Sequence, residues 1–310
     1  MPLKTIKEDT ANGLTLQWVL QVQNYKLFLN KSRCVGCQIC SLACPKEAIK
    51  IEKRLKVQAE KAQKARIDVD LAKCNFCGVC DVVCPYGAVK VTSNDKHALS
   101  IVEKESFPQL VRDIQVNENK CNVDCFKVKD PCPLDLIRVS LLRPDGKTIE
   151  DPYSLSEKER ESLTVKVDVD KDHCPCCKVC EGKLPAGVMH VRKFLQGRIN
   201  IRGEKCPEGC TDCLDVCPVT GALYLSEEDK KVHPNETFCV YCGSCKIVCP
   251  VDEALEFKRT HVEHTPVHSG AWNKALERLT SPIEMTKELK MKGSLRARES
   301  VKKRIGLKAK

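Results

Sequence analysis

Aromatic residues are scarce in this sequence, and long apolar runs are missing. Only 7 Phe, 5 Tyr and 2 Trp occur among 310 residues, which excludes a core built mainly from aromatic side chains. No stretch approaches the ~20 consecutive apolar residues of a transmembrane helix. The opening MPLKTIKEDTANG lacks the apolar centre of a secretory signal. We therefore expect a soluble, cytoplasmic chain without a membrane span.

The common sequence signatures of catalysis are also missing. The chain has no glycine-rich loop of the kind that binds phosphates, no flavin or nicotinamide fingerprint, and no nucleophile paired with a base. We therefore expect no catalytic residues, and a protein that is not itself an enzyme.

Cysteine, by contrast, is abundant. The chain has 23 cysteines, and thiols in a reducing cytoplasm rarely form disulfides. Disulfide frameworks also belong mostly to secreted chains much shorter than this one. The pattern therefore favours metal ligation by the thiols.

The cysteines belong to a unit that occurs six times. Each unit begins with an alternating, strand-like stretch, continues through a cysteine run and a proline, and ends in a second short strand. The leading stretches are YKLFLNKSR, ARIDVDLAK, RDIQVNENK, TVKVDVDKDH, GRINIRGEK and VHPNETF, and the trailing ones are AIKIE, AVKVT, LIRVS, VMHVR, ALYLS and ALEFK. A cysteine run has room for a loop and a short helix that the proline ends. The sequence therefore predicts an α+β fold.

Four of the six cysteine runs are complete, and a proline follows each directly. They are Cys34, Cys37, Cys40 and Cys44 before Pro45; Cys74, Cys77, Cys80 and Cys84 before Pro85; Cys206, Cys210, Cys213 and Cys217 before Pro218; and Cys239, Cys242, Cys245 and Cys249 before Pro250. A zinc site usually offers two separated cysteine pairs to one ion, which leaves no role for a third cysteine at the same spacing. The runs resemble the C-x2-C-x2-C-x3-C-P motif of bacterial two-cluster ferredoxins, with one extra residue in the first gap of the run at 206.

This resemblance implies the ligands of four [4Fe-4S] clusters. In two-cluster ferredoxins the first three thiolates of a run hold one cube, and the fourth reaches the cube of the partner run. The resulting ligand groups are site 1 (Cys34, Cys37, Cys40, Cys84), site 2 (Cys74, Cys77, Cys80, Cys44), site 4 (Cys206, Cys210, Cys213, Cys249) and site 5 (Cys239, Cys242, Cys245, Cys217).

The two middle runs are incomplete, and the same scheme still completes one cube from them. The later run has three cysteines before Leu184, and the earlier run ends in Cys132 followed by Pro133. Cross-ligation then assigns Cys132 to the cube of the later run. Site 3 therefore consists of Cys174, Cys177, Cys180 and Cys132.

A sixth cube would need Cys121, Cys125 and two positions that Val128 and Leu184 occupy. Both replacements are apolar, so side chains could fill the volume of that cube, and we expect five [4Fe-4S] clusters. Cys176 has no role in this scheme and is interpreted as a packing thiol. The alternative is that it joins Cys121 and Cys125 in a labile or three-iron sixth cluster.

The runs pair into three tandem ferredoxin-like modules between two terminal segments. The expected divisions are an N-terminal arm (1–21), module 1 (22–93, two clusters), module 2 (94–195, one cluster, with a surface insertion at 141–163), module 3 (196–258, two clusters) and a basic helical tail (259–310).

The tail differs in composition from the modules. AWNKALERL places Trp272, Leu276 and Leu279 on one helical face. Residues 287–310 contain ten Lys or Arg against two Glu, which is +8 of the chain's net charge of +10. Neither interleaved aromatic residues nor a nucleic-acid motif accompanies this charge. We therefore expect residues 259–310 to dock on a larger protein complex, and we expect no nucleic acid partner.

Several such modules in one chain resemble the polyferredoxins of methanogenic archaea, over residues 22–258. With its insertion and extra terminal helices, the chain is most similar to the polyferredoxin subunit of formylmethanofuran dehydrogenase, although that family has more modules. The resemblance implies a carrier or store of low-potential electrons for CO2 reduction in methanogenesis. The alternatives are an iron-sulfur subunit of a hydrogenase or heterodisulfide reductase complex, and a nucleic-acid-associated protein with structural clusters.

Overall fold

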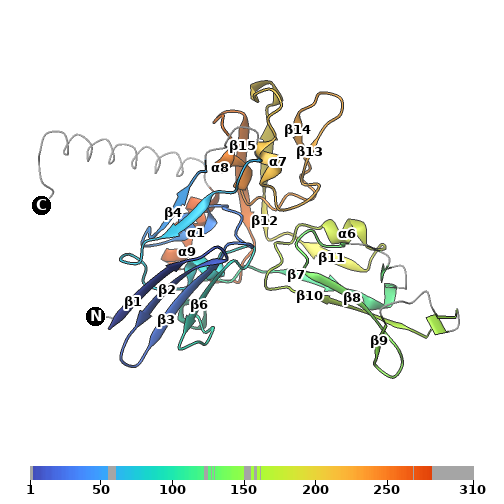
Figure 1. Cartoon of the computed structure of the whole chain (residues 1–310), viewed down its shortest axis with the longest axis horizontal. Coiled ribbons are helices and arrows are strands. Elements are labelled where there is room, and N and C mark those ends of the chain that lie inside the picture. The colour runs from blue at the N-terminus through green and yellow to red at the C-terminus, as the bar shows by residue number, and fades with distance from the viewer. Residues whose placement is uncertain are drawn as a thin grey trace, which may run out of the picture.

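Figure 1 shows the computed structural model of the chain, in which strands and short helices alternate. The structure describes residues 3–54, 61–121, 125–126, 128, 130–149, 155–156, 159–160, 162–267 and 269–280. These residues combine helices and strands, as the predicted α+β class requires.

Module 1 is built from two antiparallel strand pairs. Its strands are β3 (Asn24–Asn30), β4 (Ile49–Glu52), β5 (Arg66–Val69) and β6 (Val89–Ser93). The outer strands β3 and β6 pair with each other, and so do the inner strands β4 and β5. Each cysteine run therefore lies between an outer and an inner strand, and the two runs lie side by side.

The same strand pairing recurs twice further along the chain. Module 2 contains β7 (Asp113–Val116), β8 (Ile137–Leu142), β10 (Thr164–Val169) and β11 (Met189–Arg192). Module 3 contains β12 (Leu195–Ile201), β13 (Leu223–Leu225), β14 (Val232–Pro234) and β15 (Leu255–Val262). In both modules the first strand pairs with the last, and the second pairs with the third.

A short helix follows the ligand loop in five of the runs. These helices are α1 (Ile39–Ala43), α2 (Val79–Val82), α6 (Val179–Lys183), α7 (Asp212–Asp215) and α8 (Ser244–Val248). Each is short because a proline follows within a few residues and excludes further helical hydrogen bonding. The helices α1 and α2 contact each other, as do α7 and α8.

Residues 1–21 do not form the expected arm. β1 (Lys4–Asp9) and β2 (Gly13–Val19) form a hairpin that extends the outer pair of module 1, so the strand order is β1-β2-β3-β6. The Trp18 ring on β2 lies 5.0 Å from the Phe76 ring, measured between centroids. Phe76 belongs to the loop between Cys74 and Cys77, and the hairpin therefore covers that loop.

The expected surface insertion at 141–163 begins inside a strand. Its first residues continue β8 and form a hairpin, which was not predicted from the sequence. β8 continues through Leu142, and β9 (Thr148–Ile149) pairs back onto it. The backbone N–H of Arg143 donates to the Lys147 carbonyl at 2.9 Å and closes the turn. Other short elements are α3 (Ser100–Glu103) and the 3-10 turns at Glu118–Lys120 and Gly203–Lys205.

The helix α9 (Gly270–Thr280) packs within the molecule. Trp272 is 1% exposed, and its indole N–H donates to His264 Nε2 at 3.1 Å. The Trp272 ring also meets the Phe107 ring edge to face, with 5.1 Å between centroids. On its other sides α9 contacts α1 of module 1 and β15 of module 3.

This packing corrects the prediction that the apolar face of the tail docks on a partner. Trp272 and Leu279 are buried and Leu276 packs against the core, so the face is used between modules 1 and 3. The basic stretch that follows, residues 281–310, lies outside the described residues.

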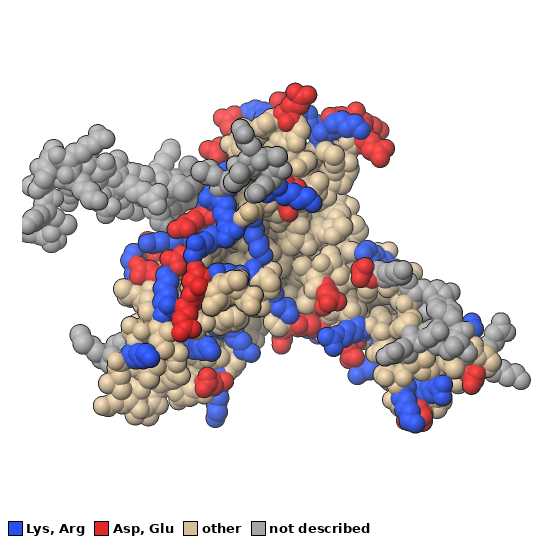
Figure 2. All heavy atoms as spheres, in the orientation of Figure 1, with Lys and Arg blue, Asp and Glu red and all other residues tan. Residues whose placement is uncertain are grey.

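The three modules meet around a common centre (Figure 1), with module 1 at the left, module 2 at the right and module 3 at the top. Buried side chains from all three belong to one connected core. Figure 2 shows Lys and Arg side chains gathered where module 1 borders module 3. None of the helices that the structure describes is long and apolar enough to cross a bilayer.

Candidate iron-sulfur sites

The second cysteine of four runs is flanked by residues in the left-handed backbone region. The residues before it are Gly36, Phe76, Cys176 and Tyr241, with φ between 50° and 68°, and the residues after it are Gln38, Gly78, Lys178 and Gly243, with φ between 67° and 88°. Left-handed turns of this kind aim successive backbone N–H groups into one concavity, as in many iron-sulfur sites. Only three of the eight are glycine, so the loops hold five side chains in a conformation that costs energy.

Other backbone N–H groups, four residues after the last cysteine of a run, donate to the sulfur of that cysteine. Ala48 N–H donates to Cys44 Sγ at 3.4 Å, and Ala88 N–H donates to Cys84 Sγ at 3.2 Å. Cys132 likewise accepts from backbone N–H groups of the residues that follow it, two and four positions on. Hydrogen bonds from N–H to sulfur stabilise cluster thiolates and tune their potential. Cys132 therefore has the surroundings of the fourth cysteine of a complete run.

In module 1 the four thiols of site 1 neighbour one another, and so do the four thiols of site 2. Burial, followed by the neighbouring thiols of Cys37, Cys84 and Cys34, raises the pKa of Cys40. At site 2 the pKa of Cys80 is raised first by burial and then by Cys77 and Cys74. Asp81 and the Cys44 thiol raise it further. Cys84 and Cys44 each come from the opposite run, which is the crossed arrangement that the spacing predicts.

Thiols of two runs also neighbour each other at the remaining three sites. Burial and three thiol neighbours raise the pKa of Cys180 at site 3 and of Cys213 at site 4 to about 12 each. At site 5 burial and thiol neighbours raise the pKa of Cys245. The neighbours are Cys177, Cys174 and Cys132 for Cys180; Cys210, Cys206 and Cys249 for Cys213; and Cys242, Cys239 and Cys217 for Cys245.

The thiols of a site interact without converging on one point. Across the described residues, no three Cys, His, Asp or Glu side chains come close enough to hold a single metal ion. The ligands of one tetrahedral ion lie about 2.3 Å from it, whereas a [4Fe-4S] cube takes each thiolate on a different iron. A cube at each site would also supply the positive charge that the buried thiolates need.

The positions of the incomplete sixth cube are occupied by protein. Cys121 and Cys125 are joined in a disulfide, contrary to the expectation that thiols here avoid such bonds. Leu184 is buried, and Val128 packs against the core. Cys176 is also buried, at the left-handed position that Gly36 holds in the first run. Cys176 is therefore placed in the ligand loop by the same backbone turn as Gly36.

One buried hydroxyl gives an independent test of whether these sites fit a cluster. Tyr86 is 3% exposed, and its hydroxyl has no nitrogen or oxygen partner among the described residues. After burial, the Cys242 thiol is the largest influence that raises the pKa of Tyr86, so this thiol lies near the hydroxyl. A buried hydroxyl without an acceptor is costly, and a thiolate bound to iron is a good acceptor. The residues therefore fit the group that the cysteine spacing predicts.

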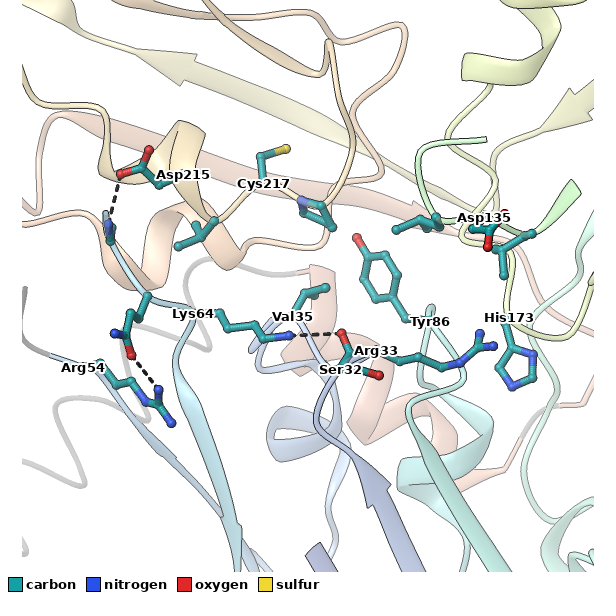
Figure 3. A pocket seen from close by; sticks show the side chains of 16 residues that line it. Ser32, Arg33, Val35, Arg54, Lys64, Tyr86, Asp135, His173, Asp215 and Cys217 are labelled. Atoms are coloured by element: carbon teal, nitrogen blue, oxygen red, sulfur yellow. Dashed lines mark hydrogen bonds between the residues drawn. The ribbon is translucent and has the colours of Figure 1, made fainter. Parts of the chain in front are cut away.

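A cavity of about 720 Å³ opens where the three modules meet. Figure 3 shows Tyr86 in it, with the hydroxyl directed away from module 1. Arg33, Lys64 and Asp215 also line the cavity. The Lys64 ammonium donates to the Lys31 carbonyl at 2.8 Å and so closes the loop before site 1.

Three basic side chains that the sequence did not single out lie between sites. Arg112 donates to the carbonyls of Cys84 and Cys174, at 3.1 Å each, and so joins site 1 to site 3. Lys193 donates to the Cys239 carbonyl at 2.8 Å and acts electrostatically on Cys177, which joins site 5 to site 3. Arg259, on β15, lies between sites 1 and 5. Isolated basic residues carry no sequence signal that distinguishes them from solvated ones.

Comparison with known proteins agrees with this geometry. The 4Fe-4S dicluster domain pattern matches residues 33–88 and 196–253. The chain is 31% identical over 107 residues to the polyferredoxin-like subunit of the aliphatic sulfonate oxidoreductase of Pyrococcus furiosus, covering 31% of this chain and 59% of that protein. It is 31% identical over 85 residues to an uncharacterized ferredoxin of Methanocaldococcus jannaschii, covering 27% and 48%. The matches thus span about half the length of these curated relatives.

A solved structure matches over almost the whole chain. It is a chain of the formate dehydrogenase, heterodisulfide reductase and formylmethanofuran dehydrogenase complex of Methanospirillum hungatei. The TM-score is 0.77 and the identity 30%, with 90% of this chain and 92% of that chain covered. The chain therefore belongs to the 4Fe-4S ferredoxins, in the polyferredoxin-like form that repeats dicluster domains.

Proposed function

We propose that the chain is a polyferredoxin that holds five [4Fe-4S] clusters in three modules, at sites 1 to 5. The observation that supports this most strongly is the crossing of the runs. At each of the five sites, three thiols of one run lie beside a fourth thiol from a different run. This crossing is the ligand arrangement of two-cluster ferredoxins.

When bound, each [4Fe-4S] cluster accepts and releases one electron at a time. The residues of the chain bury the thiolates, aim backbone N–H groups at their sulfur and exclude water from the ligand loops. The protein accordingly serves as a non-catalytic carrier or store of low-potential electrons within a larger redox complex.

The enzyme supplied with electrons is proposed to be formylmethanofuran dehydrogenase, in CO2 reduction. The support is the likeness to a chain of a complex that includes this enzyme, over 90% of the present chain. The same complex includes a heterodisulfide reductase, so exchange with that enzyme is the second candidate. The net +8 of residues 287–310 suits docking on an acidic surface of such a complex.

A reductive titration tests this function. Anaerobic protein should take up about five electrons per chain, one for each cube. The reduced protein should then be reoxidised by formylmethanofuran dehydrogenase when CO2 and methanofuran are added, and less rapidly by heterodisulfide reductase with its disulfide substrate. Uptake of less than one electron per chain would refute electron transfer, and the reverse order of rates would assign the second partner.

A further inference from the structure

Sites 1 and 5 face each other across the border between modules 1 and 3. Cys37 of site 1 and Cys242 of site 5 act on each other electrostatically, because after burial the Cys242 thiol is the largest influence raising the pKa of Cys37. Both cysteines are buried.

Arg259 lies at this border with its charge enclosed. The residue is 4% exposed, and its guanidinium donates to the carbonyls of Tyr241 (2.9 Å), Cys242 and Leu279 (3.5 Å). It also stacks over the Phe257 ring, 4.9 Å from the centroid. These contacts fix the cation beside the ligand loop of site 5.

The charges around Arg259 come from both modules. Its strongest electrostatic neighbours are the thiols of Cys37 in module 1 and of Cys242 and Cys245 in module 3, followed by Tyr86. No carboxylate pairs with Arg259 among the described salt bridges. Because an arginine stays protonated in proteins, this buried cation needs negative charge, and the thiolates of sites 1 and 5 are the groups positioned to supply it.

Tyr86 lies on the module 1 side of the same border. It follows Cys84 and Pro85, the end of the second run, and its hydroxyl interacts with Cys242 of site 5. Tyr86 of module 1 therefore places a buried hydroxyl without a hydrogen-bond partner among the described residues near a ligand of module 3, while Arg259 of module 3 presents its charge to a ligand of module 1.

We propose that Arg259, together with the Tyr86 hydroxyl, is a shared positioning element that raises the reduction potentials of the clusters at sites 1 and 5. This inference rests on the proposed function. Reduction adds one negative charge to a cluster, and a fixed cation in a low-dielectric surrounding stabilises the reduced form more than the oxidised form. Sites 1 and 5 thereby become a matched pair that joins modules 1 and 3 without a residue of module 2.

Arg259→Gln removes the charge and keeps a side chain that can donate to the carbonyls, and Arg259→Lys keeps the charge. Tyr86→Phe removes only the hydroxyl. Arg202→Gln is the matched control, because Arg202 follows β12 in the same module and pairs on the surface with Glu256. All are made in the full chain, purified anaerobically, and titrated with dithionite while the spectrum of the reduced clusters is followed by electron paramagnetic resonance.

In Arg259→Gln, two of the five reduction steps should move to more negative potential. The ratio of reduced to oxidised cluster in each should fall roughly tenfold or more at a fixed potential. Arg259→Lys should stay near the unmodified protein, Tyr86→Phe should move one step, and Arg202→Gln should move none. Five unchanged potentials in Arg259→Gln, or a shift of only one, overturn the proposal.

Iron content separates failure of this inference from failure of the proposed function. If the unmodified chain binds no cubes, the function itself is refuted. If the unmodified chain binds five cubes and Arg259→Gln does not change the reduction potentials, only the proposed role of Arg259 is refuted. If Arg259→Gln does not assemble, Tyr86→Phe decides, since unchanged potentials in that isosteric variant also overturn the proposal.

Discussion

At the residue scale, the spacing of the cysteines predicts which thiols meet, and the reason is geometric. Proline after the fourth cysteine ends each short helix, so the fourth thiol leaves its own loop and reaches the neighbouring run. The same expectation applies to Cys132 of the incomplete middle runs, which acts electrostatically on Cys180 together with Cys177 and Cys174. Arg259 could not be predicted, because its burial depends on α9, which is distant from the ligand loop until the chain folds.

The assignment of site 3 gives a prediction for single cysteines. Cys132→Ala should remove the cube held by the later middle run, some forty residues away, and lower the iron content by about four per chain. Cys121→Ala should leave the iron content unchanged, because that cysteine is in a disulfide with Cys125. Iron analysis of anaerobic protein measures both.

Cys176→Ala is the matched control for Cys132→Ala. It removes a buried thiol from the same module, beside the ligand Cys177, without removing a proposed ligand. Its iron content should equal that of the unmodified chain. Loss of iron in Cys121→Ala or Cys176→Ala, with none in Cys132→Ala, would show that the ligands of the middle module are misassigned.

At the element scale, the strands around each run follow from alternation, whereas the two terminal elements do not. The alternating stretches beside the runs become the paired strands of all three modules. The hairpin β1-β2 was missed because nothing local distinguishes an arm from a strand pair that completes a distant sheet edge. The apolar face of α9 was recognised, but periodicity does not reveal whether its partner is another protein or the chain itself.

The hairpin β1-β2 should protect the cluster at site 2. Trp18→Ala removes the ring that packs on Phe76, a contact worth about 1 kcal/mol beyond its buried area. We expect one of the five clusters to bleach faster in air, seen as a fast phase in the decay of iron-sulfur absorbance. Val22→Ala, at a side chain 86% exposed, is the control. Uniform bleaching of all five clusters would argue against a local role for the hairpin.

Two truncations should separate the roles of α9 and of the basic stretch after it. A chain ending at residue 280 keeps α9, and it should hold five clusters but bind its complex less tightly, with the loss greatest at low salt. A chain ending at residue 262 also lacks α9, which covers α1 and receives a hydrogen bond from Arg259. That chain should bind its complex less tightly and should also lose iron from sites 1 and 5.

Iron analysis and binding to the complex at two salt concentrations measure these effects. Full iron in the shorter chain would mean that α9 does not support the sites. Full binding by the longer chain would exclude the basic stretch from docking.

At the scale of the whole molecule, three segments with the same strand pairing (22–93, 94–195 and 196–258) share one core, and the proposed sites 1, 3 and 5 are linked by basic side chains. Arg112, Lys193 and Arg259 each contact or act on two of these sites. The repeat could be predicted from the sequence, because alternation and cysteine spacing are local. How the modules meet depends on contacts between distant segments, which one sequence does not encode in any local pattern.

The count of clusters is the central claim, and combined iron, acid-labile sulfide and zinc analysis of anaerobically purified full-length protein tests it most directly. Five cubes predict about 20 iron and 20 sulfide per chain, four of each per cube, with no stoichiometric zinc. About 24 iron would mean that Cys121 and Cys125 open their disulfide and join a sixth cluster. Stoichiometric zinc with little iron or sulfide would contradict the account as a whole.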